Sequence, residues 1–146
     1  MSVKSLDEVK LHEFIGKVVN EWGAALSALT IFVGDRLGLF KAMVGAGGLT
    51  PDELAKRTGT YPRMIREWLA SMAAGGFVIY NPNNRTYVLP NEQAVAVTDE
   101  NSPAYIAGAY ASLASLFKDI EKIIGAFQTG KGLGWGDHHP YLFEGT

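Results

Sequence analysis

The sequence predicts a mostly α-helical fold: a winged helix-turn-helix with an N-terminal helix pair, a small β-hairpin wing and a long C-terminal helix. Three observations predict it. Apolar residues recur at helical spacing near both ends of the chain, two helix-start signals flank a glycine-containing turn in its middle, and two short β-branched and aromatic runs follow. The 146 residues are enough for one compact domain.

The N-terminal helix pair is predicted from two apolar stripes. Ser5 and Glu8 have the spacing of a capping box, so the first helix is expected to begin there. Its stripe consists of Leu11, Phe14, Ile15, Val18 and Trp22. Gly23 is expected to bend or break the helix. The second stripe consists of Leu26, Leu29, Val33, Leu37 and Phe40. This second helix is apolar on nearly all sides, so we expect it to be buried.

A helix-turn-helix is predicted from residue 50 to residue 76. Thr50 and Glu53 have capping-box spacing and Pro51 occupies the first helical position, so a short helix should start there. A turn containing Gly59 ends it, and Pro62 lies in the first turn of the second helix. The residues expected in its core are Leu54, Ile65, Leu69 and Met72.

The wing is predicted from two runs that favour β-strands, Phe77–Tyr80 and Thr86–Leu89. The five residues between them, Asn81–Arg85, have the composition of a turn. A hairpin directly after a helix-turn-helix is the winged-helix arrangement.

A long helix is predicted to begin at Ser102 and Pro103. Its apolar residues alternate four and three positions apart: Ile106, Tyr110, Leu113, Phe117, Ile120, Ile124 and Phe127. This period keeps one stripe facing a partner helix along the whole length. Beyond Gln128 the chain consists mainly of Gly, His, Pro and aromatic residues. We therefore expect residues 1–128 to form a winged-helix dimerisation domain and residues 129–146 to form a linker that would lead into a further domain.

The first and last stripes predict a homodimer. A small winged helix cannot cover both, and apolar patches of this size usually mark interfaces. The residues expected at the interface are Leu11, Phe14, Ile15, Val18, Trp22, Ile106, Tyr110, Leu113 and Phe117. The alternative is that the two stripes cover each other within one chain.

Composition and motifs exclude several kinds of site. The chain has 13 basic and 15 acidic residues, a net charge of −2, and no cysteine, which excludes thiolate nucleophiles, disulfides and cysteine-based zinc sites. Gly130–Gly134 follows a helix rather than a strand, unlike a phosphate-binding loop, and Asp137–His139 provides too few converging ligands for a metal. We therefore assign no catalytic, cofactor-binding or metal-binding residue.

The sequence shows neither an export signal nor a membrane span. The first ten residues are polar, and the most apolar stretch, Ala24–Val33, is half as long as the roughly 20 residues that a span requires. We therefore expect a cytoplasmic protein without a membrane partner.

DNA binding is a second hypothesis, supported by three basic residues. Arg63 and Arg66 lie early in the second helix of the helix-turn-helix, and Arg85 lies at the tip of the wing. The rest of the exposed helix face is poor in side chains that read base edges. DNA is therefore a less favoured partner than a second copy of the chain.

Two segments resemble a known family. Leu49–Gly59 and Arg63–Leu69 together resemble the N-terminal winged-helix domain of bacterial SAM-dependent methyltransferases, a group also labelled transcriptional regulators. Leu37–Phe40, Gly76–Val78 and the aromatic tail Trp135–Gly145 fit the same pattern. The resemblance extends over roughly residues 12 to 146.

The resemblance implies a module that forms homodimers and, in related dimeric enzymes, helps to close a substrate pocket. It also implies a Rossmann-like second domain that binds S-adenosylmethionine, and no segment of this chain matches that domain. The leading hypothesis is thus a non-catalytic homodimerisation module without a cofactor of its own, from a methyltransferase lineage. The alternatives are a winged-helix DNA-binding transcriptional regulator and a binder of a small apolar ligand.

Overall fold

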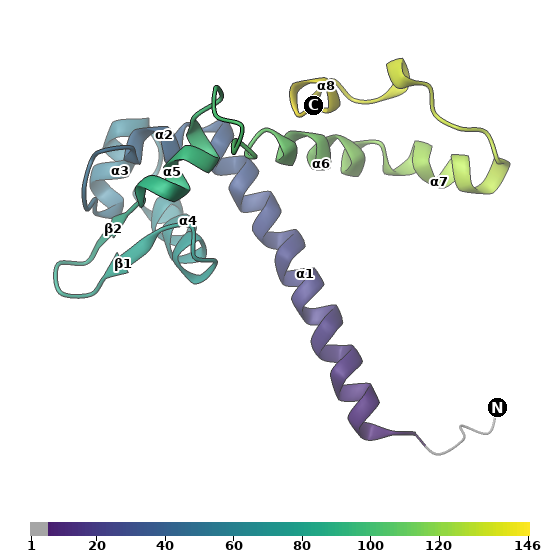
Figure 1. Ribbon diagram of the computed structural model, residues 1–146, viewed down its shortest axis with the longest axis horizontal. Helices are drawn as coiled ribbons and strands as arrows, with labels where there is room; N and C mark the ends of the chain where they lie inside the picture. The colour runs from purple at the N-terminus through teal and green to yellow at the C-terminus, as the bar shows by residue number, and fades with distance from the viewer. Residues whose placement is uncertain (1–5) are drawn as a thin grey trace.

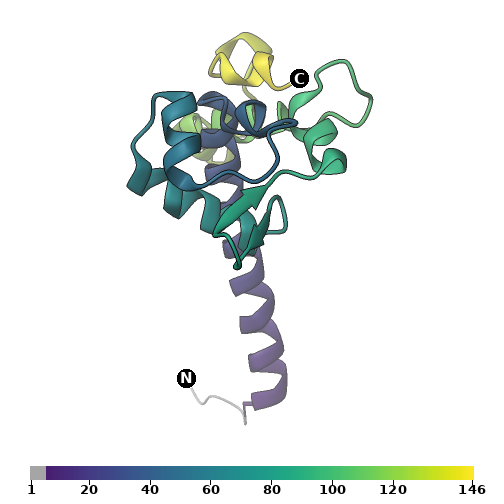
Figure 2. The same cartoon turned by 90° about the vertical axis from the view of Figure 1, so that its left-hand side faces the viewer.

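The computed structural model describes residues 6–146 and places a winged-helix body at one end of a long N-terminal helix (Figure 1). The C-terminal helices leave the body as a second arm that diverges from the first (Figure 1). Figure 2 shows that the N-terminal half of the first helix extends well beyond every other element. The fold is mostly helical with a winged helix, as the sequence predicts.

The first element is one helix rather than the predicted pair. α1 runs without a break from Glu8 to Arg36, and Gly23 lies inside it. The prediction of a break at Gly23 was wrong because a single glycine costs a helix only about 1 kcal/mol relative to alanine. Asp7 caps the helix, and its carboxylate accepts a hydrogen bond from the backbone N–H of Lys10. Ser5, the predicted cap, lies outside the described residues.

A short helix follows a tight turn after α1. Gly38 has a φ of 67°, a left-handed conformation that glycine adopts without strain, and it turns the chain into α2, Leu39–Met43. Leu39 and Phe40 are fully buried there. The predicted second helix therefore ends at Arg36, and its last residues belong to a separate element that enters the core.

The helix-turn-helix is confirmed. It consists of α3, Pro51–Thr58, and α4, Pro62–Ala74. The predicted capping box is present: the Thr50 backbone N–H donates to Glu53 Oε2 at 2.8 Å, and the Glu53 N–H donates to Thr50 Oγ1 at 3.3 Å. Gly59 ends α3 with a φ of 65°. The four predicted core residues are buried: Leu54, Ile65, Leu69 and Met72.

The wing is a two-stranded antiparallel hairpin, shorter than predicted. β1 is Ile79–Asn81 and β2 is Thr86–Val88. Val78 is buried, and its N–H donates to the Met72 carbonyl in the turn after α4 instead of to a neighbouring strand. The first residues of the predicted strand therefore pack into the core, and strand pairing in the hairpin begins only after them.

α1 is anchored to the body where it crosses α4. The indole N–H of Trp68 donates to the Thr30 carbonyl at 2.8 Å, and the ring lies edge-on to Phe40 with centroids 4.9 Å apart. The ring lies directly against Gly34, where any side chain would overlap it. A residue without a Cβ therefore permits this close crossing.

The predicted long C-terminal helix is divided into several elements. α5, Asn91–Thr98, was not predicted; α6 then spans Ala109–Lys118 and α7 spans Ile120–Thr129. The prediction of one helix from Ser102 to Phe127 was wrong at its start and at Asp119, which interrupts it. The apolar repeat continues across this break, so the repeat alone gives no sign of it.

Asp119 breaks the helix because its carboxylate binds the tail of the chain. It accepts hydrogen bonds from the His139 backbone N–H at 2.7 Å and from Lys122 Nζ at 2.9 Å, and His138 Nδ1 lies 3.3 Å away. The hydrogen bond from the His139 N–H, followed by that from Lys122, lowers the pKa of Asp119 to about 2. The break between α6 and α7 is therefore a polar attachment point.

The segment expected to be a linker folds back along α6 (Figure 1). It contains a 3₁₀ turn at Trp135–Asp137 and α8, Tyr141–Glu144. Gly145 permits a close approach to the start of α6, since a Cβ there would lie only 2.6 Å from the carbonyl oxygen of Gly108, the residue before α6. Glu144 forms an ion pair with Arg36 of α1 at 2.8 Å. The tail therefore connects the two arms.

Replacing Gly34 with Ala should destabilise the protein by roughly 1–3 kcal/mol, because the added methyl group would overlap the Trp68 indole. The matched control is Gly23→Ala in the same helix, where a Cβ meets nothing within 4 Å. That change should stabilise by roughly 0.5–1 kcal/mol. Urea unfolding measures both; equal effects would contradict the close crossing.

Replacing Asp119 with Asn should lower the free energy of unfolding at pH 6. The folded-state pKa of Asp119 is about 2, below its ordinary value of 3.8. Its stabilising contribution is therefore complete above the ordinary value and is lost as the pH falls through about 2. The difference between D119N and the unmodified chain should shrink between pH 4 and pH 2. Glu121→Gln on α7 is the control, and a pH-independent difference for D119N would contradict the assignment.

Candidate dimer interface

The N-terminal half of α1 projects from the body and is exposed along its whole length. Every side chain from Glu8 to Leu26 is exposed, and α1 stands free of the body in both views (Figures 1 and 2). The exposed fraction is 63% for Phe14 and 66% for Trp22. The apolar stripe of Leu11–Trp22 is therefore not covered by the stripe of Ile106–Phe127. The alternative that the two stripes cover each other within one chain is wrong for α1.

The apolar stripe and the buried face of α1 lie on opposite sides of the helix. At about 100° per residue, the buried Ala28, Ile31 and Gly34 face the body. The stripe points away from the body and continues along the C-terminal half of the helix. We call the following exposed residues the α1 stripe: Leu11, Phe14, Ile15, Val18, Trp22, Leu26, Leu29 and Val33. Attachment of α1 to the body therefore leaves the whole stripe accessible.

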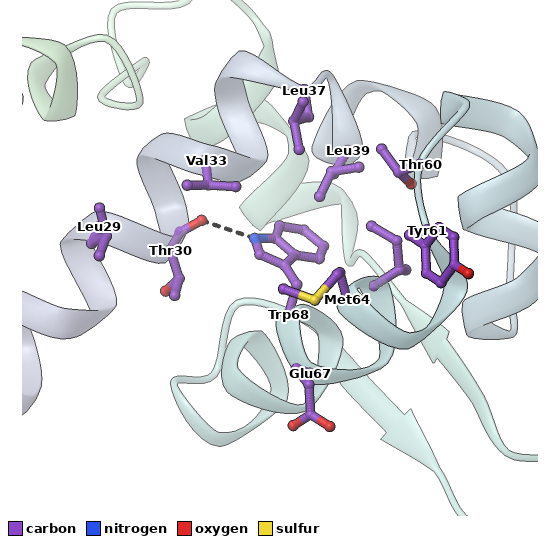
Figure 3. A pocket seen from close by; sticks show the side chains of 11 residues that line it. Leu29, Thr30, Val33, Leu37, Leu39, Thr60, Tyr61, Met64, Glu67 and Trp68 are labelled. Carbon is purple, nitrogen blue, oxygen red and sulfur yellow. Dashed lines mark hydrogen bonds between the residues drawn. The ribbon is translucent and has the colours of Figure 1, made fainter.

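One apolar groove lies between α1 and α4 (Figure 3). It encloses about 530 Å³. Its lining residues are Leu29, Thr30, Val33, Leu37, Leu39, Thr60, Tyr61, Met64, Ile65, Glu67 and Trp68. Trp68 is held by Thr30 and Phe40 and forms a fixed wall, whereas Met64 and Tyr61 are largely exposed at the rim. The groove is thus a preformed apolar surface beside the α1 stripe.

A second apolar groove lies in the wedge between α1 and α6 and encloses about 510 Å³. Its lining residues are Trp22, Ala25, Leu26, Ala28, Leu29, Phe32, Tyr110, Leu113, Ala114, Phe117, Lys118 and Tyr141. Tyr141 comes from the tail, where its ring packs edge-on against Phe32 at 5.4 Å and lies beneath the Arg36 guanidinium at 5.2 Å. Leu29 lines both grooves, so they flank the same ridge.

The structure brings four of the nine predicted interface residues together in this wedge: Trp22, Tyr110, Leu113 and Phe117. Four others lie on the protruding half of α1: Leu11, Phe14, Ile15 and Val18. Ile106 is exposed but lies outside both grooves, in the turn before α6. Met64 and Tyr141 were missed because each comes from an element whose own periodicity does not connect it to α1.

The three predicted DNA contacts are exposed, and two of them meet. Arg66 of α4 and Arg85 of the wing line one polar cavity, together with Asp52 at the start of α3. Arg63 lies on the same exposed side of α4 but does not line the cavity. Among the ion pairs of residues 6–146, none involves these arginines. A mixed-charge surface therefore occupies the position of the recognition helix and wing.

Residues 6–146 contain no group of three or more His, Asp or Glu side chains placed to hold a metal ion. None of the helices within that range combines the length and apolar character needed to cross a bilayer.

Comparison with known proteins identifies the family. The profile of the Rv2258c-like winged HTH domain matches residues 24–99, just over half of the chain. No curated protein matches the sequence.

Solved structures share the fold. The mitomycin 7-O-methyltransferase MmcR superposes with a TM-score of 0.71 at 21% identity over 86% of this chain and 37% of its own. CalO1, a methyltransferase in calicheamicin biosynthesis, gives 0.63 at 18% identity over 88% and 37%. An O-methyltransferase family protein from Burkholderia thailandensis gives 0.59 at 15% identity over 89% and 36%.

These similarities confirm the resemblance found in the sequence. The chain spans less than two fifths of the length of each of these structures. The winged helix predicted for residues 50–89 falls within the matched region. The chain belongs to the Rv2258c-like winged helix-turn-helix domain family.

Proposed function

We propose that this chain is a non-catalytic homodimerisation domain of a SAM-dependent methyltransferase system. The observation that carries the proposal is the α1 stripe, which stays exposed along the whole helix although it is as apolar as a core. Monomeric proteins rarely leave a continuous patch of this length in water. Pairing about a two-fold axis buries the same patch on both chains at once.

The apolar surface of the α1 stripe supports association. A large apolar side chain contributes about 1.5–3 kcal/mol when it is fully removed from water. The eight stripe residues are between 38% and 66% exposed. Burying the exposed part on both chains would therefore contribute roughly 12–24 kcal/mol, compared with an association cost of about 4–15 kcal/mol. The two grooves add further apolar surface.

The link to methyl transfer comes from the relatives. MmcR and CalO1 are named as methyltransferases, and this chain shares the fold of a part of each. In our proposal, S-adenosylmethionine and the methyl acceptor bind to a different domain, and the grooves beside α1 help to close the acceptor pocket once the dimer has formed. No residue of this chain is assigned to the transfer step itself.

DNA binding is a second candidate, favoured by the cavity that Arg66 and Arg85 share. Two guanidinium groups at the junction of recognition helix and wing are suited to phosphate contacts. The carboxylate of Asp52 in the same cavity and the chain's net charge of −2 oppose it. A small apolar ligand is a third candidate, since each groove has the volume of a ligand pocket.

The unmodified chain should sediment as a dimer. The double variant Phe14→Glu/Val18→Glu should sediment as a monomer, because it would place unpaired charges in an apolar interface. Both residues are exposed in the single chain, so its helical circular dichroism should be retained. Lys10→Gln/Lys17→Gln, on the polar side of the same helix, lowers the net charge by the same two units and should remain a dimer. A monomer at every concentration for the unmodified chain would refute the proposal.

Replacing Arg63, Arg66 and Arg85 together with Ala should leave the dimer intact, because all three lie outside the grooves. In a mobility-shift assay at physiological salt, we expect no sequence-specific complex with either protein. A specific complex with the unmodified chain that disappears in the triple variant would establish the DNA-binding candidate instead.

A further inference from the structure

We infer that two copies of this chain pair their α1 helices in antiparallel orientation, with Trp22 facing Trp22 at the two-fold axis. The protruding half of each helix then lies along the α1 stripe of its partner, between α4 and α6. This inference rests on the proposed homodimerisation and adds the direction and the register of pairing.

The spacing of the stripe is symmetric about Trp22. Seven large apolar residues that are all exposed form its central row: Leu11, Ile15, Val18, Trp22, Leu26, Leu29 and Val33. Their separations are four, three, four, four, three and four residues, the same series read from either end. In an antiparallel pair with Trp22 at the two-fold axis, every row residue of one chain therefore faces a row residue of the other chain.

The mean spacing suits two nearly straight helices. The row covers 22 residues in six steps, close to the 3.6 residues of a helical turn, so it stays on one side of α1 without marked supercoiling. The paired length is then roughly 33 Å. The unbroken path of α1 through Gly23 is essential, because a bend there would separate the two halves of the row.

The antiparallel direction follows from what surrounds each half of the helix. The C-terminal half is flanked by the α4 groove and the α6 wedge, with Leu29 on the ridge between them. The N-terminal half carries the same apolar row and is exposed at every position from Glu8 to Leu26. In a parallel pair, the C-terminal halves of the two α1 helices would face each other, and no further helix would fill the grooves beside them. In an antiparallel pair, the protruding N-terminal half of each α1 lies on the C-terminal half of the other.

The register also predicts where the Phe14 side chain packs. Phe14 and Phe32 are eighteen residues apart, five helical turns, and so lie on the same flank of α1 beside the central row. Phe32 faces the α6 wedge. A two-fold axis perpendicular to both helices keeps this flank on the same side in each chain. The partner's Phe14 would therefore enter the wedge near Leu29 and Leu113.

Disulfide trapping tests the register, because the natural chain contains no cysteine. Ile15 of one chain faces Leu29 of the other in this arrangement. The double variant Ile15→Cys/Leu29→Cys should therefore form a covalent, reducible dimer on mild oxidation. Within one helix these positions are roughly 21 Å apart, far beyond the reach of a disulfide. Each single variant should stay unlinked, since its own counterpart is equally distant.

A second pair and a matched control make the test specific. Val18→Cys/Leu26→Cys should also form the covalent dimer, which keeps the test valid if the first variant folds poorly. Lys10→Cys/Ala24→Cys has the same fourteen-residue spacing as the first pair but lies away from the stripe, and it should not link.

The outcomes separate the register from the proposed function. Covalent dimers from both stripe pairs, without links in the single variants or the control, support the register. If the unmodified chain sediments as a dimer but Ile15→Cys alone links to itself, pairing is parallel; the register is then overturned and homodimerisation stands. A monomeric unmodified chain overturns both.

Discussion

The contact between Trp68 and α1 is the constraint on which the rest of the structure depends. The indole lies against Gly34, donates to the Thr30 carbonyl and packs edge-on to Phe40, so a single side chain joins α1, α2 and α4. It fixes which side of α1 faces the body. Because that side is opposite the apolar stripe, the same contact that anchors the helix also leaves its stripe in water.

The tail extends this arrangement with polar and aromatic contacts. Asp119 interrupts the C-terminal helix and holds the backbone at His139, and the tail then brings Tyr141 beside Phe32. Arg36 of α1 contacts both the Tyr141 ring and Glu144. The wedge between the two arms therefore has a wall from the last residues of the chain, and its shape depends on the attachment at Asp119.

We propose that the winged helix acts as a scaffold for the α1 stripe rather than as a DNA-binding element. Its core is formed by residues with clear helical spacing, and the surface that would face DNA combines Arg66 and Arg85 with Asp52. The apolar surface lies instead on α1 and in the grooves at either side of it. The proposed partner, a second copy of this chain, would bury this apolar surface.

The sequence by itself determined the features that depend on neighbouring residues. The capping box at Thr50, the turn at Gly59 and the apolar spacing of α4 are local, and the structure contains all three. The stripe from Leu11 to Trp22 could also be identified, because helical periodicity is visible in one segment.

Only the tertiary structure decided where these local patterns begin and end. α1 continues through Gly23 because one glycine costs a helix only about 1 kcal/mol relative to alanine, and its C-terminal half is held by the contact between Gly34 and Trp68. The predicted helix across Asp119 is broken because that carboxylate binds a backbone N–H twenty residues further along. Met64 and Tyr141 reach the α1 surface from other elements. Contacts between distant segments leave no periodic signal in the sequence, so their effect on helix ends and groove walls appears only once the chain has folded.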